Sequence, residues 1–462
     1  MTSSSQGRAA AAGMLLLALA LVAGATAATV WQAKAVFAVL GAVGLIVLFL
    51  VPRRLVAPIS IAVVLVLAYA VAAPGAPLTG WLVTSGVAVL LLGISLARGT
   101  AVPVRHWAVA ALLALFYASL GVATLLGTPE NLARWLFAAV VPLCVAVMAT
   151  RLAGDGVRLV ALVVVALSVG EALLALGELT VLHSPIWGYP VTDAGVPVIQ
   201  LNPLLGGRVP RAQGSVGHPV VLGFVLAIGF VLAWVDLARL RAALRWPTLV
   251  VIAGGLTLSG TRSALAAAAI GVLLVLFTGR DVGRKVRAVF VVAFVGATGL
   301  VLAASIRSTA AQVSTTGSYT HRVGALDGVF GLMSRPFTEA LLGSGMGSER
   351  SLFLRGLLQT DGFYAIDNEL VTVLATAGVI GLVLFLAACV AAVARATPRL
   401  RGVLVTVFVM FFSFDVTSWS LGTTLLALVL TLALRRSSAP TPADPDGAVE
   451  ASAAPQRAAL RV

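Results

Sequence analysis

Residues 211–235 have the sequence RAQGSVGHPVVLGFVLAIGFVLAWV, in which a polar, glycine-containing stretch passes directly into the apolar run from Val220 to Trp234. An apolar run of this kind is typical of a membrane-spanning helix. Arg211, two glycines and His218 stand at the mouth of that helix. This combination predicts a binding site for an anionic ligand that is carried on a lipid.

The composition of the chain places most of it in a membrane. Of its 462 residues, 60% are hydrophobic and only 10% are charged, which is too few to cover the surface of a soluble protein. The net charge of +14 could indicate a nucleic-acid partner, but the arginines recur in twos and threes between apolar runs, as in cytoplasmic loops. We therefore expect no nucleic-acid partner. Cys144 and Cys389 lie within apolar runs and predict neither a disulfide nor a metal site.

Apolar runs recur along the whole chain, and one membrane span needs about 20 residues. The fourteen candidate spans are 9–29, 35–52, 55–73, 81–97, 107–126, 134–150, 157–180, 218–235, 246–258, 263–279, 288–306, 367–394, 401–416 and 419–434. They predict an all-α, polytopic transmembrane helix bundle of about 12–14 spans, because backbone groups in lipid must be satisfied within each segment. The first run resembles a signal peptide, but the alternation of loops favours an uncleaved helix.

The distribution of positive charge predicts the orientation. With the N-terminus inside, the short outer turns hold only Lys34, Arg134 and Arg262. The short inner loops then carry groups of two to four basic residues, such as Arg53 with Arg54, or Arg239, Arg241 and Arg245, which favours the cytoplasm for that side. Both chain ends are then cytoplasmic. The predicted order is N-terminal spans 1–180, a long external loop 181–217, central spans 218–306, a second long external loop 307–366, C-terminal spans 367–436 and a disordered cytoplasmic tail 437–462.

The two long external loops are rich in Gly, Pro, Ser and aromatic residues, which predicts loops with short helices rather than a separate domain. Loops of this length in a compact protein are usually functional or disordered. Ionisable residues near membrane depth mark functional sites, because they are costly to bury. Those that fall toward the outer face are Glu178, Arg208, Arg211, His218, Arg262, Arg322, Asp367 and Asp415, with Glu171 two turns deeper on the face of Glu178.

Two interpretations remain open for the cations of this set. Arg262, in the outer turn of a tight helical hairpin, could bind a phosphate or reach lipid headgroups. Arg211 and His218 could bind substrate, or they could be a loop arginine and a helix-capping histidine. The set as a whole suits transfer of a sugar from a polyprenyl diphosphate, since arginine binds phosphate through forked donors and a carboxylate can accept the proton of the attacking hydroxyl.

This chemistry needs no metal ion and no cofactor. Asp444–Asp446, which is the only Asp-x-Asp of the chain, lies in the tail and does not predict a metal site.

Three stretches in the second half of the chain carry a family resemblance. They are RAQGSVGHP at 211–219, LSGTRS at 258–263, and a series that runs from THR at 320–322 through Pro336 and LGSGMG at 342–347 to DNEL at 367–370 and GVIG at 378–381. In order, spacing and placement at the outer face they resemble the bacterial O-antigen ligase and O-antigen polymerase family of membrane glycosyltransferases.

The resemblance implies transfer of glycan from a polyprenyl-diphosphate carrier to a glycan or lipid acceptor at the outer face of the cytoplasmic membrane. It implies that Arg211 and Arg262 contact the diphosphate. The family's ligases carry a catalytic histidine immediately before the position of Asn368, where this chain has Asp367. Aspartate can also act as a base, and the difference favours a polymerase or another glycan transferase over a ligase. The further residues that we expect to bind substrate are His218, Arg322, Asn368, Arg208 and Glu178.

The alternative function is a flippase or another transporter of lipid-linked glycan, in which Glu171 and Glu178 would couple protons. Transporters place ionisable groups through the midplane and often contain inverted repeats. This chain contains no detectable repeat, and its polar residues gather toward one face. The sequence therefore favours the enzyme.

Overall fold

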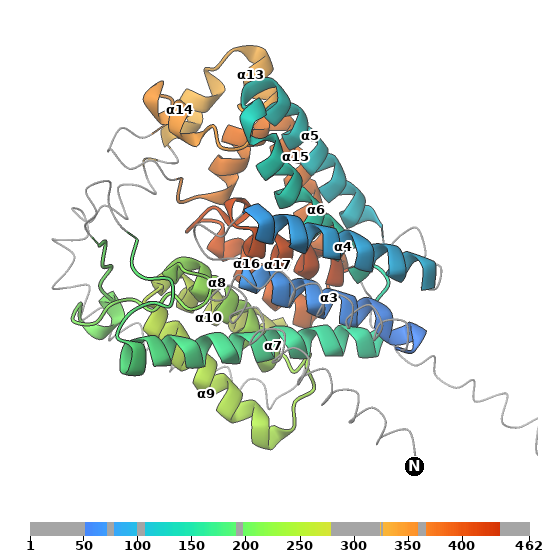
Figure 1. Cartoon of the computed structure of the whole chain (residues 1–462), viewed down its shortest axis with the longest axis vertical. Coiled ribbons are helices and arrows are strands. Elements are labelled where there is room, and N and C mark those ends of the chain that lie inside the picture. Colours follow the sequence, from blue (N-terminus) through green and yellow to red (C-terminus); the bar gives the residue numbers. More distant parts are fainter. Residues whose placement is uncertain are drawn as a thin grey trace, which may run out of the picture.

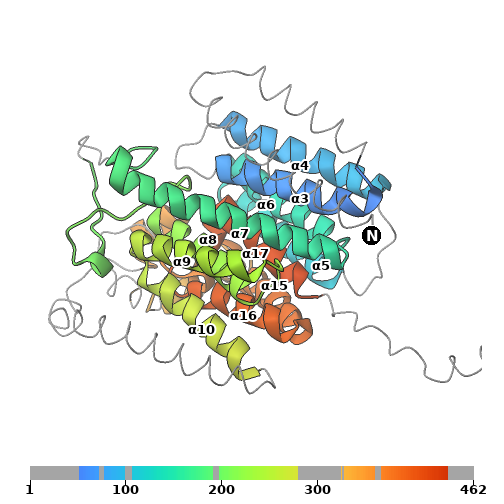
Figure 2. The same cartoon turned by 90° about the horizontal axis from the view of Figure 1, so that it is seen from below.

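The computed structural model describes residues 51–71, 78–98, 107–190, 197–278, 324, 327–358 and 366–434. In these ranges the chain forms a helix bundle without β-strands, in which one isolated bridge joins Leu201 and Pro210 (Figures 1 and 2). The predicted all-α class is confirmed. The predicted spans 9–29 and 288–306, nearly all of 35–52, and the tail lie outside the described residues.

Every predicted span that falls on described residues corresponds to a helix. These helices are α3 (Arg53–Ala70), α4 (Leu78–Arg98), α5 (Ala108–Gly127), α6 (Leu132–Ala149), α7 (Gly154–Gly177), α8 (Pro219–Trp234), α9 (Ala242–Ser259), α10 (Arg262–Thr278), α15 (Glu369–Arg395), α16 (Pro398–Met410) and α17 (Ser420–Leu432). Seven helices of the described ranges are long and apolar enough to cross a membrane, and α8, α10 and α17 are shorter apolar helices. The chain is a multi-pass membrane protein.

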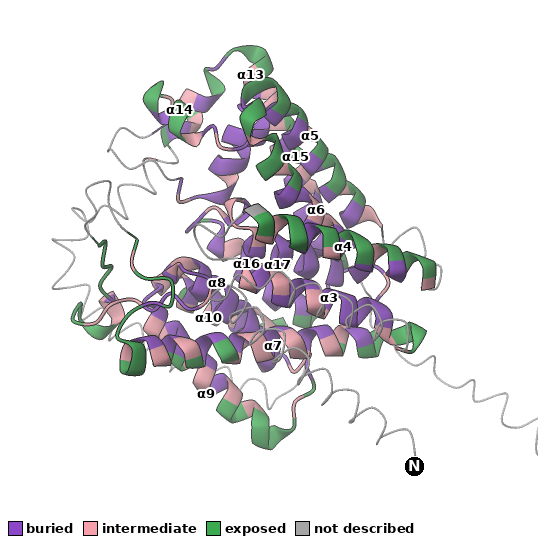
Figure 3. Cartoon of the chain, viewed as in Figure 1, coloured by how far each residue is buried: buried purple, intermediate pink, exposed green. Residues whose placement is uncertain are grey.

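The packing follows from where the apolar side chains lie on each helix. Helix α8 is apolar on every side, and a helix of that kind belongs in the interior of a bundle. Thirteen of its sixteen residues are buried, and α7, α9, α10 and α16 surround it (Figure 3). Other helices expose large apolar side chains outward, among them Leu126 of α5, Val250 of α9 and Val390 of α15. In a bundle of this composition, such side chains face lipid.

The two ends of the bundle differ in chemistry. At one end, arginines of the predicted cytoplasmic loops link neighbouring connections. Arg151 donates from Nη1 to the carbonyl of Ser95 in α4 (3.3 Å), and Arg158 of α7 donates from Nε to the carbonyl of Ala238, after α8 (3.4 Å). These contacts bring the last residues of α4, α6 and α8 together with the start of α7, as the predicted alternation requires. The short connections from α5 to α6 and from α9 to α10 lie at the opposite end and contain no arginine between the helices.

Two predicted spans need correction. The span 401–416 ends earlier, because α16 stops at Met410 and a 3-10 turn, η5 (Val416–Ser418), precedes α17. The span 367–394 is not one continuous helix, because Gly378 interrupts α15 with φ 65° and ψ −166°. The described part of loop 307–366 contains the predicted short helices, α13 (Phe337–Leu342) and α14 (Glu349–Leu354).

The break at Gly378 leaves carbonyl groups of α15 without partners in their own helix, and such groups must be satisfied inside a membrane protein. The stretch LGSGMG at 342–347, which belongs to the third of the three motifs (320–322, 336, 342–347, 367–370 and 378–381), supplies the donors. The backbone amide of Ser344 donates to the carbonyl of Ala375 (3.0 Å), and the amide of Gly345 donates to the carbonyl of Thr376 (2.9 Å). The buried guanidinium of Arg335 donates to the Ala375 carbonyl as well (2.9 Å). The glycines of this motif therefore serve close backbone packing against the break.

Candidate functional site

The candidate site begins at the turn from α9 to α10, where Gly260 has φ 65°. The last carbonyls of a helix have no partner within it, and the loop before α8 provides their donors. Asn202 donates from Nδ2 to the carbonyl of Thr257 (2.9 Å), and Arg211 donates from Nε to the carbonyl of Ser259 (2.8 Å). A cation at this end of a helix is also stabilised by the helix dipole. Arg211 thus caps α9.

The same arginine joins the first motif to the second. Arg211 Nη2 donates to Thr261 Oγ1 (2.9 Å), and Thr261 Oγ1 donates to the carbonyl of Pro219, the first residue of α8 (2.9 Å). Arg211 Nη1 donates to Gln200 Oε1 (3.1 Å), which anchors the arginine to its own loop. The stretches 211–219 and 258–263 are therefore in direct contact, although about forty residues separate them in the chain.

Arg262 follows this turn as the first residue of α10. Its side chain is partly buried, and its Nε atom is buried without a hydrogen-bond partner among the residues that the structure describes. An arginine stays charged in any protein environment, and leaving a buried donor unpaired is costly. This donor is therefore available to an oxyanion, such as a phosphate oxygen of a ligand.

Two buried carboxylates of α7 and its final turn hold the loop in front of α8. The Glu178 carboxylate accepts from the backbone amides of Gln213 (2.8 Å) and Gly214 (3.1 Å). The Glu171 carboxylate accepts from the amide of Ser215 (2.9 Å) and from its hydroxyl. The two acids share a face of the helix, as predicted. Gly214 has φ 62°, and a Cβ there would lie 2.3 Å from Glu171 Oε2, so this position requires glycine.

We expect Glu178→Ala to loosen this loop. Three backbone amides, those of Ile186, Gln213 and Gly214, lose their acceptor, and the local opening free energy should fall by about 2–4 kcal/mol. Hydrogen–deuterium exchange of residues 197–217 in the purified protein measures the change as faster exchange. Glu130→Ala, which removes an exposed acid just before α6, is the control and should leave the exchange of that loop unchanged. Equal exchange in wild type and Glu178→Ala would contradict the loop-holding role.

His218 occupies the N-cap position of α8, but its side chain makes no capping hydrogen bond, so the capping interpretation is wrong for the side chain. Its ring instead packs against Trp419 at the start of α17, with the ring centroids 5.1 Å apart. Burial lowers the pKa of His218 to about 4, and the charge of Arg211 acts in the same direction. The imidazole is therefore neutral near pH 7. Its Nδ1 atom has no hydrogen-bond partner in the described part of the chain.

The third motif joins this cluster at the start of α15. Asn368 is buried and caps the helix, because its Oδ1 accepts from the amides of Leu370 (3.0 Å) and Val371 (3.2 Å). The next residue, Glu369, is fully buried and accepts from the amide of Thr417 (2.9 Å).

Thr417 stands two residues before Trp419, the partner of His218. All three motifs therefore meet at one end of the bundle, with the partly buried Asp367 beside them.

Asp415 lies in the connection between α16 and α17, outside both helices, and its pKa is raised. Burial raises the pKa of Asp415 to about 7, the charges of Glu349 and Asp367 add to the rise, and a hydrogen bond with Ser418 opposes it. An unfolded aspartate titrates near about pH 3.9, so between these values the folded state binds more protons. The stability from this group is complete below about pH 4 and is lost as the pH rises through about 7.

We therefore expect Asp415→Asn to unfold at a higher temperature than wild type at about pH 8 and to lack part of the fall in stability between about pH 5 and 7. Thermal unfolding of the purified protein across this range measures the difference. Asp155→Asn, at an exposed position on α7, is the control and should keep the wild-type profile. Identical pH profiles for wild type and Asp415→Asn would rule out a raised pKa at this residue.

Two predicted residues have no contact that places them in this cluster. Arg208 is exposed on the first external loop, and Arg322 lies outside the described residues. Sequence reasoning in turn missed Glu369 and Trp419. A charge directly before a long apolar run was a visible signal for Glu369, whereas the sequence contained none for the pairing of Trp419 with His218.

Neither a comparison with protein-family models nor a search of curated proteins found a match to this chain.

Proposed function

We propose that this protein is an integral-membrane glycosyltransferase, similar to the O-antigen ligases and polymerases. It would transfer or polymerise glycan from a polyprenyl-diphosphate carrier onto a glycan or lipid acceptor. The site that we propose lies where α8, α10, α15 and α17 begin. The proposal places this end at the outer face of the cytoplasmic membrane, because the arginine-rich connections at the other end favour the cytoplasm.

One observation carries the proposal. Three polar motifs from separate parts of the chain meet at one end of the bundle, and they bring together a cation with an unpaired buried donor, a neutral histidine and carboxylates. The contacts are those of Arg211 with Thr261, of His218 with Trp419 and of Glu369 with Thr417. Arginines bind phosphate, and a nearby carboxylate can accept a proton, so the set suits a phosphate-activated donor and a hydroxyl acceptor.

Each cation has its own part in the proposed reaction. Arg262 contacts the diphosphate through its buried donor and stabilises the negative charge that grows as the diphosphate departs. Arg211 bonds to Thr261, the residue directly before Arg262. Through this bond Arg211 holds the turn in place, and its charge adds to that of Arg262 beside the leaving group. His218 contacts the substrate through its open ring nitrogen.

The proposed chemical step is a displacement with inversion at the anomeric carbon. The acceptor oxygen forms a bond to that carbon while the bond from the carbon to the diphosphate oxygen breaks, and the electron pair leaves with the diphosphate. The proton of the acceptor hydroxyl passes to the carboxylate of Asp367. This scheme uses no metal ion and no cofactor.

The proposed function is tested on the lipid-linked glycans of cells that carry Asp367→Asn in place of the wild-type chain. Mass spectrometry of the extracted lipids distinguishes the outcomes. Single repeat units that accumulate on polyprenyl diphosphate, with long chains lost, would identify a polymerase. Long chains that stay on the lipid would identify a ligase. An unchanged lipid pool, with the variant present at wild-type level in the membrane, would overturn the proposed function.

The transporter alternative depended on Glu171 and Glu178 as a proton-coupling pair. Both carboxylates accept hydrogen bonds from backbone amides of the loop before α8. These contacts favour a structural role for the pair, and we therefore propose the enzyme alone.

A further inference from the structure

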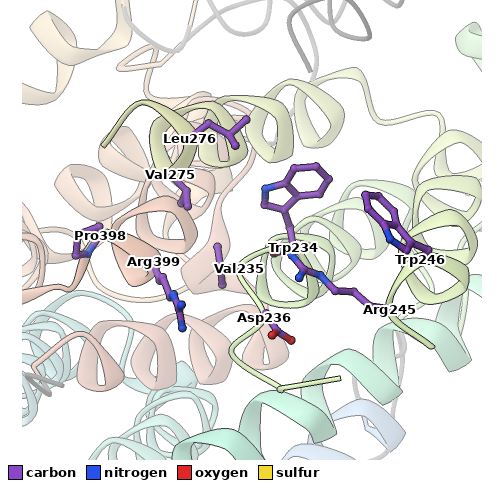
Figure 4. A pocket seen from close by; sticks show the side chains of 9 residues that line it. All are labelled: Trp234, Val235, Asp236, Arg245, Trp246, Val275, Leu276, Pro398 and Arg399. Atoms are coloured by element: carbon purple, nitrogen blue, oxygen red, sulfur yellow. Dashed lines mark hydrogen bonds between the residues drawn. The ribbon is translucent and has the colours of Figure 1, made fainter. Parts of the chain in front are cut away.

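A cavity of about 210 Å³ lies at the end of the bundle opposite the candidate site. It is formed where α8 and α10 end and where α9 and α16 begin, so four separate segments of the chain enclose it (Figure 4). The lining combines two arginines and two tryptophans with small apolar side chains. The charged and aromatic residues of the lining are Trp234, Asp236, Arg245, Trp246 and Arg399. The proposed glycan transfer uses none of them.

The charges of the cavity come from opposite walls. In Figure 4, Arg245 reaches in from α9 and Arg399 from α16, with the cavity between them. Arg245 donates from Nη2 to the carbonyl of Trp234, and its Nε is buried without a hydrogen-bond partner in the described ranges. Asp236 is the single acid of the lining, and its Oδ1 accepts from the amide of Leu240 (3.0 Å). With two arginines and one aspartate, the lining has a formal net charge of +1.

The apolar part of the cavity continues onto the surface of the bundle that faces lipid. Trp234 and Trp246 meet edge to face with centroids 6.2 Å apart, and Trp246 is 60% exposed. Val275 and Leu276 form the wall on α10. Tryptophan is typical of the depth at which headgroups meet acyl chains. The cavity thus has a cationic end and an apolar side at the membrane interface.

We propose that this cavity binds an anionic phospholipid from the leaflet at this end of the bundle. The phosphate lies between Arg245 and Arg399, where it accepts from the unpaired Nε of Arg245. The acyl chains lie along Trp246 and the wall formed by Val275 and Leu276. Basic pockets between helices at this depth bind acidic lipid headgroups by the same attraction. The inference goes beyond the proposed function, because it concerns the opposite end of the molecule and an ordinary membrane lipid.

The test measures lipid that is bound to the purified protein. Wild type is exchanged into detergent with equal amounts of phosphatidylglycerol and phosphatidylcholine, and native mass spectrometry counts the lipids that stay attached. We expect wild type to retain phosphatidylglycerol selectively. Its retention should fall about fivefold in Arg399→Gln and about thirtyfold in the double variant with Arg245→Gln. Arg241→Gln, which removes an exposed arginine just before α9 that does not line the cavity, is the matched control and should bind as wild type does.

Using two variants separates the loss of lipid binding from the loss of folding. Arg245 also contacts the carbonyl at the end of α8, so its replacement could disturb the fold, whereas the exposed side chain of Arg399 makes no such contact in the described structure. Wild-type retention by Arg399→Gln, or equal loss in Arg241→Gln, would overturn the proposal. Release of the lipid by inorganic phosphate at millimolar concentration would also overturn it in favour of a free-phosphate site. None of these outcomes depends on glycan transfer.

Discussion

Arg262→Ala should abolish most of the activity of this protein while leaving its fold intact. The Nε atom of Arg262 is buried without a partner among the described residues, so its removal leaves no protein acceptor unsatisfied. In the proposed reaction, the same donor stabilises the departing diphosphate. The loss of one donor of this kind typically lowers turnover by about 10²–10³-fold. Glycan transfer from a polyprenyl-diphosphate donor, measured with purified protein in vesicles, gives the rate of each variant.

Arg134→Ala provides the matched control, because Arg134 is an exposed arginine in the first turn of α6, at the same end of the bundle. We expect its rate to equal that of wild type. Arg262→Lys separates charge from geometry, since lysine keeps the charge but loses the forked donors. A rate between those of wild type and Arg262→Ala is expected. If Arg262→Ala retained the wild-type rate, Arg262 would be an arginine that only reaches lipid headgroups.

Gly378→Ala should prevent stable folding. The backbone of Gly378 has φ 65° and ψ −166°, a conformation that is essentially restricted to glycine. A Cβ at this position would lie 2.4 Å from the amide nitrogen of Gly343 and 2.4 Å from the carbonyl oxygen of Leu341. Both contacts are with backbone atoms, which cannot move aside as the end of a flexible side chain can. We expect the free energy of unfolding to fall by about 3 kcal/mol or more, because the backbone is strained and because the Cβ pushes α15 away from residues 341–343.

The measurement is the thermal unfolding of the purified variant, together with its yield in the membrane fraction. Gly170→Ala, in the middle of α7, is the control, because a Cβ there has no heavy atom within 4 Å. Alanine favours a helix over glycine, so this control should be neutral or slightly stabilising. A Gly378→Ala protein that unfolds at the wild-type temperature would show that the backbone at this break is not strained.

The sequence predicted the helices well because lipid imposes a simple rule on them. Any run that crosses the membrane must be apolar and must satisfy its own backbone, so the runs at 107–126 and 218–235 became α5 and α8 with ends within a few residues. The tight hairpin at 246–279, with its short runs, followed the same rule and became α9 and α10. The glycine in its turn marked the place where the helix ends.

The break within α15 and the early end of α16 depend on partners that are distant in sequence. The sequence marked Gly378 only as the first residue of the GVIG stretch, and the backbone of residues 342–347 reveals why the helix opens there. The roles of single side chains depend on such partners too. Arg211 caps α9 and Asn368 caps α15, and the sequence contained no signal for either of these contacts.

The central claim is that the end of the bundle where α8, α10, α15 and α17 begin carries out glycan transfer. Its most direct test uses purified protein in vesicles with a synthetic polyprenyl-diphosphate oligosaccharide and a hydroxyl acceptor, without metal ions. Release of polyprenyl diphosphate is measured together with the new glycosidic bond. We predict that wild type and Arg134→Ala form both products at equal rates, and that Arg262→Ala forms almost none. Wild-type rates in Arg262→Ala, or movement of the intact donor across the membrane without bond cleavage, would contradict the claim.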